Sequence, residues 1–252
     1  MLYFAHHDTL FRNNPGPDLS RYPASAAPSR VLLFLLVASC SSLVNAAPEG
    51  GQIVAGSGSI NQAQSVTDIN QNTQSMVVDW QSFNVNRHET VNFNQPSSSA
   101  TALNRIYDQN PSQIFGSLNA NGRVFLSNPN GLIFGADSVV NVGALLATSL
   151  NIDADRFMQG DYQLSSALAE SGAVVNYGLL QAATGGSISL LGSQVENHGV
   201  IVANYGQVNL LSGSQATVSF DGNGLINFRI DEGVIKNALT RDNAIHNTGQ
   251  IH

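Results

Sequence analysis

Two pairs of carboxylates are the residues of this chain best suited to acid–base chemistry. Asp153 and Asp155 lie two positions apart, and Asp231 is followed directly by Glu232. Two carboxylates that flank a bond can act as general acid and as base or nucleophile, as in most glycoside hydrolases. The other acids are scattered along the chain, and Asp153 stands where a short helix over 153–160 would begin. We therefore interpret both pairs as solvated loop acids.

Nucleophiles and metal ligands show no catalytic pattern either. After residue 47 the chain contains four histidines: His88, His198, His246 and His252. Their spacing is not that of a metal site, and no Gly-x-Ser-x-Gly sequence is present. Gly56-Ser57-Gly58 lacks the third glycine of a dinucleotide-binding loop, so we interpret it as an N-terminal linker. The sequence predicts no enzyme, no metal and no cofactor.

An asparagine-rich turn is the most distinctive local feature. Asn128-Pro129-Asn130-Gly131 separates two apolar runs, 124–126 and 132–134. Pro fixes φ at the second turn position, Asn tolerates the third and Gly is favoured at the fourth. The pattern predicts strand, tight turn, strand, with the turn in a surface loop. Asn→Ala changes there are expected to cost only about 1 kcal/mol, the cost of a lost side-chain cap.

Composition excludes several classes of protein. Of the 252 residues, 11% are charged and 42% are hydrophobic, so the chain is neither a disordered protein nor a charged helical bundle. The net charge of −7 with a single lysine, Lys236, argues against nucleic acid and anionic lipid as partners. Cys40 is the only cysteine, so the chain cannot form an internal disulfide.

The first 46 residues have the features of an extension followed by a secretory signal. An apolar run at 31–39 follows Arg30 and is too short to span a bilayer as a helix. Small residues before Ala47 make the Ala46–Ala47 bond the expected cleavage site. The segment before Cys40 also resembles a bacterial lipoprotein box, but the nearby Ala46 site favours an ordinary signal. The 29 residues before Arg30 could be an extended signal region or the result of a wrongly assigned translation start.

The rest of the chain, 47–252, is a series of short strands separated by Asn, Gly, Ser and Pro. Brief helices are expected only at 153–160 and 165–170. Asn176-Tyr177-Gly178 is matched 21 residues later by Asn197-His198-Gly199, and a third copy opens at Asn247 after an excursion over 221–242. A period near 20 residues predicts a parallel β-helix whose coils stack about 4.8 Å apart.

The repeat also predicts which side chains stack. Ile188 and Leu190 should point inward over Val208 and Leu210, and Asn176 should stack on Asn197 at a corner. Leu190→Asp is therefore expected to unfold the region, whereas a change at the outward-facing Ser189 is expected to be tolerated. The chain stops inside the third copy, which suggests a fragment or the first part of a longer solenoid.

Seven segments resemble a known family when taken together in order. They lie at 79–85, 91–97, 102–106, 111–118, 120–126, 128–135 and 142–150. The chain resembles the two-partner-secretion domain at the N-terminus of filamentous-haemagglutinin-type exoproteins of Gram-negative bacteria. The resemblance extends from about residue 59 to the end of the chain.

The resemblance implies an all-β fold, a right-handed parallel β-helix with an N-terminal cap. It implies secretion to the cell surface through the periplasm and an outer-membrane β-barrel transporter with POTRA domains. The domain would target a large adhesin-type protein and nucleate its folding outside the cell. A C-terminal passenger beyond His252 could then contact a host cell, but its activity, whether adhesin, haemolysin, toxin or haem acquisition, is not encoded in this chain.

The motifs of the resemblance are the expected recognition site for the transporter. These residues are Asn104, Arg105, Asn121, Gly122, Asn128, Pro129, Asn130 and Gly131. The turn at 128–131 could instead be only a well-formed turn, and both interpretations can hold together. Two other functions remain open: direct binding of host glycans or receptors, and a carbohydrate-active β-helix enzyme.

Overall fold

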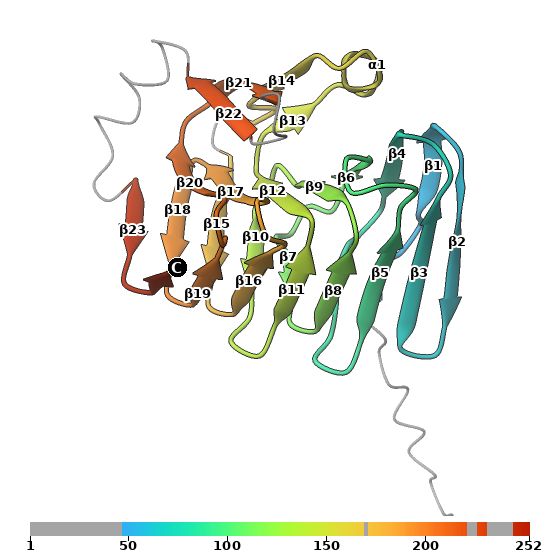
Figure 1. The fold of residues 1–252 in the computed structure, drawn as a ribbon, viewed down its shortest axis with the longest axis horizontal. Helices are drawn as coiled ribbons and strands as arrows, with labels where there is room; N and C mark the ends of the chain where they lie inside the picture. The colour runs from blue at the N-terminus through green and yellow to red at the C-terminus, as the bar shows by residue number, and fades with distance from the viewer. Residues whose placement is uncertain (1–46, 169–170, 221–225, 231–243) are drawn as a thin grey trace, which may run out of the picture. The chain divides into compact units, whose positions relative to one another are not determined.

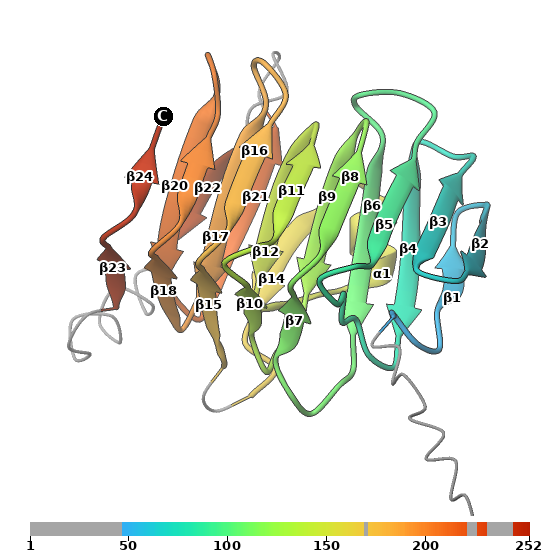
Figure 2. The same ribbon diagram turned by 90° about the horizontal axis from the view of Figure 1, so that it is seen from below.

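The computed structural model describes residues 47–168, 171–220, 226–230 and 244–252. The expected signal segment, Ala46, Cys40, the Asp231–Glu232 pair and most of the excursion lie outside the described residues. Three sheets run side by side as the faces of a parallel β-solenoid of about six turns (Figures 1 and 2). The all-β solenoid predicted from the repeat is confirmed.

The faces are sheets of seven, eight and five strands, each taking one strand from successive coils. The seven-stranded sheet contains β1 (Gln52–Ala55), β4 (Ser75–Trp80), β6 (Thr101–Ile106), β9 (Arg123–Ser127), β12 (Ala144–Thr148), β17 (Ser187–Gly192) and β20 (Gln207–Ser212). The eight-stranded sheet contains β2 (Gly58–Ala63), β3 (Val66–Gln71), β5 (Thr90–Asn94), β8 (Ser117–Ala120), β11 (Val139–Val142), β16 (Leu179–Ala182), β19 (Val200–Val202) and β24 (Gln250–Ile251). The five-stranded sheet contains β7 (Ser112–Ile114), β10 (Leu132–Phe134), β15 (Ala173–Asn176), β18 (Gln194–Asn197) and β23 (Ile245–Asn247).

The N-terminal end of the solenoid is closed by two antiparallel strands. β1 pairs with β4 and β2 with β3 in antiparallel register, whereas the later pairings within the three sheets are parallel. Such strands cover the open edge that a first coil would otherwise expose. Gly56-Ser57-Gly58 belongs to this cap, so the expectation of a linker is wrong. Gly56 has φ +80°, and a Cβ on Gly58 would lie 2.2 Å from the Asn70 carbonyl oxygen.

The predicted stacking inside the coils is confirmed. Ile188 pairs in register with Val208 and Leu190 with Leu210. Ile188 and Leu190 are buried in the core enclosed by the three sheets, and Val208 and Leu210 are partly buried and pack against it. At one corner the Asn176 side-chain amide donates to Asn197 Oδ1 at 2.8 Å. The Asn197 amide donates in turn to Asn247 Oδ1 at 2.7 Å. Each amide thus joins its coil to the next, and the third copy of the repeat takes its place in the stack.

A second core lies outside the coils, under a four-stranded antiparallel sheet (Figure 1). This sheet contains β13 (Asn151–Ile152), β14 (Tyr162–Ser165), β21 (Gln215–Phe220) and β22 (Ile226–Ile230), with α1 (Ala154–Met158) beside it. Phe125 from β9 is buried at its centre and contacts the rings of Phe157, Tyr162 and Phe220. The outward face of the seven-stranded sheet is therefore covered by protein.

The four-stranded sheet and α1 bear on three predictions, for Ser189 and for the two expected helices. Ser189 points outward as expected but is fully buried, because its strand lies beneath the second core. The helix expected at 165–170 is wrong, since β14 includes Ser165 and residues 166–168 are not helical. The helix expected at 153–160 is present as α1, and Asp153 caps it by accepting from the Arg156 N–H at 2.9 Å.

Candidate functional site

The predicted recognition residues flank one strand, β9, and its neighbour β6. Asn121 and Gly122 precede β9, while Asn128 to Gly131 follow it. Asn104 and Arg105 lie on β6 and pair in register with Leu126 and Ser127 of β9. Two adjacent coils therefore carry all three motifs, with Asn104 and Arg105 beside the end of β9 that leads into the turn at 128–131 and Asn121–Gly122 at its other end.

The turn at 128–131 has the predicted local geometry. The Gly131 N–H donates to the Asn128 carbonyl at 2.8 Å, and the Asn130 N–H donates to Asn128 Oδ1 at 2.9 Å. Gly131 has φ +105°, and a Cβ there would lie 2.4 Å from the Ala173 carbonyl oxygen. Glycine is thus required by both backbone conformation and close packing. The turn connects two sheets at a corner of the solenoid, since β9 and β10 do not pair with each other.

The turn is not a surface loop, so the reason for expecting a low cost of losing its asparagines does not apply to Asn128. That side chain is fully buried. Its amide donates to the Asn110 carbonyl at 3.1 Å and to Ser112 Oγ at 3.0 Å. Asn130 is half-buried and donates to the Asp108 carbonyl at 2.8 Å. Both asparagines hold the segment at 108–112 of the preceding coil.

Asn121 and Gly122 form a second corner around Gln95. Asn121 Oδ1 accepts from the Gln95 N–H at 2.7 Å, and its amide donates to the Gln95 carbonyl at 2.8 Å. Gly122 N–H donates to Gln95 Oε1 at 3.0 Å, while Gln95 Nε2 donates to Gln71 Oε1 at 3.0 Å. A Cβ on Gly122 would lie 2.7 Å from Gln95 Oε1. The corner therefore links three successive coils through the buried amides of Gln71 and Gln95 and the exposed amide of Asn121.

Gln95 and Gln71 are central to this corner, yet sequence reasoning did not single them out. Both are largely buried, at 7% and 4% exposure. The separation of 24 residues between them, followed by 26 residues to Asn121, is the signal that could have found them. That spacing is longer than the period of 20–21 residues at the C-terminal end, because the early coils are larger.

Asn104 and Arg105 connect the same coils through their side chains. Asn104 is buried, accepts from the Trp80 indole N–H at 3.0 Å and donates to the Phe125 carbonyl at 3.2 Å. Arg105 makes two hydrogen bonds to Asp79, at 2.7 and 2.8 Å. Burial by itself lowers the pKa of Arg105, but the hydrogen bonds and charge of Asp79 outweigh it, so the pKa is raised.

The side chains of these motifs therefore serve contacts between coils in the folded domain. Asn104 and Asn128 are both inaccessible to solvent. A partner that reads either side chain directly must do so before the chain folds. The folded surface presents only parts of the motifs, chiefly the exposed Asn121 and the half-buried Asn130.

The described residues contain no group of three or more side chains able to hold a metal ion. Within the same part of the chain, no helix is long and apolar enough to cross a membrane. Asp153 is occupied as a helix cap, and Asp155 lies in the first turn of the same five-residue helix.

A model of the TPS secretion domain matches residues 45–251, which is nearly the whole described chain. The chain belongs to the TPS secretion domain family. This family is not a family of enzymes, and its members are exported with the help of a cognate outer-membrane transporter.

Solved and curated relatives agree with this assignment. The crystal structure of the HMW1 secretion domain from Haemophilus influenzae matches with a TM-score of 0.69 and 29% identity, over 81% of this chain and 53% of that one. A heme/hemopexin-binding protein of Haemophilus influenzae is 33% identical over 208 residues, 75% of this chain and 22% of the relative. A second protein of that name is 34% identical over 141 residues, 54% of this chain and 15% of the relative. The TPS domain thus spans less than a quarter of either curated relative.

Proposed function

We propose that this TPS domain is the N-terminal secretion and targeting domain of a large adhesin-type exported protein. The observation that carries the proposal is the family match over residues 45–251, in a chain that spans only 22% of its relative's length. The proposed route runs through the periplasm to the cell surface, after cleavage of a signal at Ala46–Ala47. The proposed partner is an outer-membrane β-barrel transporter with POTRA domains.

The transporter would read the three motifs in the unfolded chain. Burial of Asn104 and Asn128 supports this order of events, because their side chains become inaccessible once the coils stack. The same groups would then be used a second time, as the hydrogen bonds that close each coil outside the cell. Folding of this first solenoid would provide the template edge on which later coils add.

The function of the whole protein is a separate proposal. Both curated relatives carry the name heme/hemopexin-binding protein, which supports haem acquisition as the activity of a downstream passenger. Adhesion to host cells is the alternative, and it follows from the resemblance to filamentous-haemagglutinin-type exoproteins.

Secretion measured with the transporter supplied and withheld tests the export role. The chain should appear in the medium only when its cognate transporter is present. Asn130→Ala should reduce secretion while the refolded domain keeps its β spectrum, because Asn130 is only half-buried. Asn141→Ala is the control, since Asn141 is exposed and lies outside all three motifs. Equal secretion of the Asn130 and Asn141 variants would rule out recognition through Asn130.

A further inference from the structure

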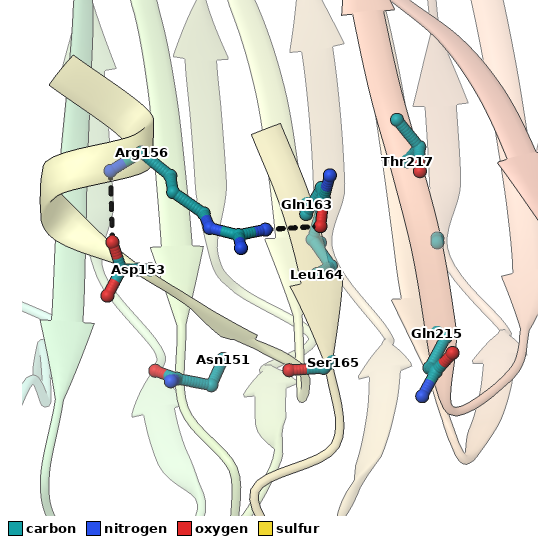
Figure 3. A pocket seen from close by; sticks show the side chains of 9 residues that line it. Asn151, Asp153, Arg156, Gln163, Leu164, Ser165, Gln215 and Thr217 are labelled. Atoms are coloured by element: carbon teal, nitrogen blue, oxygen red, sulfur yellow. Dashed lines mark hydrogen bonds between the residues drawn. The ribbon is translucent and has the colours of Figure 1, made fainter. Parts of the chain in front are cut away.

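A hollow of about 370 Å³ lies on the outward face of the four-stranded sheet (Figure 3). We call it the polar hollow. Its floor is formed by Asn151 of β13, Ser165 of β14, and Gln215 and Thr217 of β21. Arg156 of α1 reaches over it from one side, as Figure 3 shows. Leu164 and Ala216, which alternate with the floor residues, point the other way into the second core.

The floor residues differ from polar columns in which stacked amides bond to each other, as Asn119 does to Asn92 at 3.0 Å. In the polar hollow, Asn151 is opposite Ser165 and Ser165 is opposite Gln215. Side chains at such positions are close enough to bond. None of the floor side chains makes a hydrogen bond to another described residue, so their donors and acceptors are available to a ligand in the hollow.

The single positive charge at the hollow, Arg156, lies among carboxylates. The Arg156 guanidinium bonds to Gln163 Oε1 and lies 3.8 Å from an Asp161 carboxylate oxygen. Asp153 is also part of the lining. An anion would meet these carboxylates and a guanidinium that is already paired, so charge does not favour an acidic ligand. An apolar ligand would have to desolvate the amides and hydroxyls without replacing their hydrogen bonds.

We propose that the polar hollow binds a neutral saccharide. Asn and Gln side chains each offer donors and an acceptor, and Ser and Thr hydroxyls do both, which matches the hydroxyl groups of a sugar. The volume is near the lower end of ligand sites in general, which suits one or two sugar rings. This inference goes beyond the export function and does not depend on it, because no residue of the three recognition motifs lines the hollow.

The first experiment is a microarray of neutral, sialylated and sulfated oligosaccharides, probed with the labelled purified chain. Neutral oligosaccharides should give the strongest signals, and the best of them is then titrated by NMR. Asn151→Ala combined with Gln215→Ala should weaken that binding at least tenfold. Both side chains are exposed, so the double variant should keep the melting temperature of the parent within a few degrees.

A matched control is available on the eight-stranded sheet. Asn141 and Gln181 are also an exposed Asn and Gln, they pair in register on adjacent strands, and they lie outside the hollow. Asn141→Ala with Gln181→Ala should leave sugar binding unchanged. The proposal is overturned if no neutral oligosaccharide binds, or if acidic ones bind more tightly. It is equally overturned if binding survives the substitutions in the hollow or falls as much in the control.

Discussion

Replacing Asn128 with Ala should destabilise the domain far more than the same change at Asn130. The buried Asn128 amide donates to the Asn110 carbonyl and Ser112 Oγ, and its oxygen accepts from the Asn130 N–H. A net hydrogen bond contributes about 1 kcal/mol, and a buried group left unsatisfied costs about 1–3 kcal/mol. The expected loss for Asn128→Ala is therefore about 3 kcal/mol. Asn130→Ala removes one bond from a half-buried side chain and should cost about 1 kcal/mol.

Thermal unfolding of the refolded domain measures the difference. For a domain of this size, each 1 kcal/mol lowers the melting temperature by about 2–4 °C. Asn128→Ala should therefore melt about 6–12 °C below the parent, and Asn130→Ala only about 2–4 °C below it. Asn141→Ala, an exposed change on another face, is the control and should melt with the parent.

The same comparison separates folding from recognition in a secretion assay. A loss of secretion in Asn130→Ala with little loss of stability would indicate that the transporter reads the side chain. A loss confined to Asn128→Ala would be explained by folding alone. If Asn128→Ala melts within about 2 °C of the parent, the reasoning from buried hydrogen bonds is refuted.

Three further changes test the second core. Phe125→Ala should lower the free energy of unfolding, measured by urea titration, by about 3–5 kcal/mol, because it removes the ring at the centre of a buried aromatic cluster. A loss below about 1 kcal/mol would mean that packing against the four-stranded sheet adds little stability. Ser189→Asp and Leu190→Asp should both unfold the domain, since both positions are fully buried. A circular dichroism spectrum in which only the Leu190 variant lost its β signal would contradict this. Burial raises the pKa of Tyr162, despite the opposing charge of Arg123. The stability that this residue contributes is present below its unfolded pKa of about 10 and is lost as pH rises through the higher folded value. Tyr162→Phe should therefore flatten the alkaline loss of stability, and an unchanged pH profile would contradict the assignment.

Much of the fold follows from local patterns that can be recognised in the sequence. Alternating apolar and polar residues predict the strands, and the repeat of Asn176 at Asn197 predicts their stacking. The coil register then follows, because a shift of one residue would turn Ile188 and Leu190 out of the core. Asp153 predicts the start of α1, since a side-chain cap acts within one turn of helix.

The local patterns do not determine what covers the outward face of the strands. Alternation places the Ser189 side chain on the other face of the strand from Ile188 and Leu190. It does not reveal whether that face contacts water or protein. Here the cover comes from distant segments, as Leu164 of β14 pairs with Ala216 of β21 across 52 positions. For the same reason the sequence marks Asn128 as a turn residue but not as a buried one, since Asn110 and Ser112 reach it only when coils stack. Burial is a property of the assembled layers, and only the tertiary structure decides it.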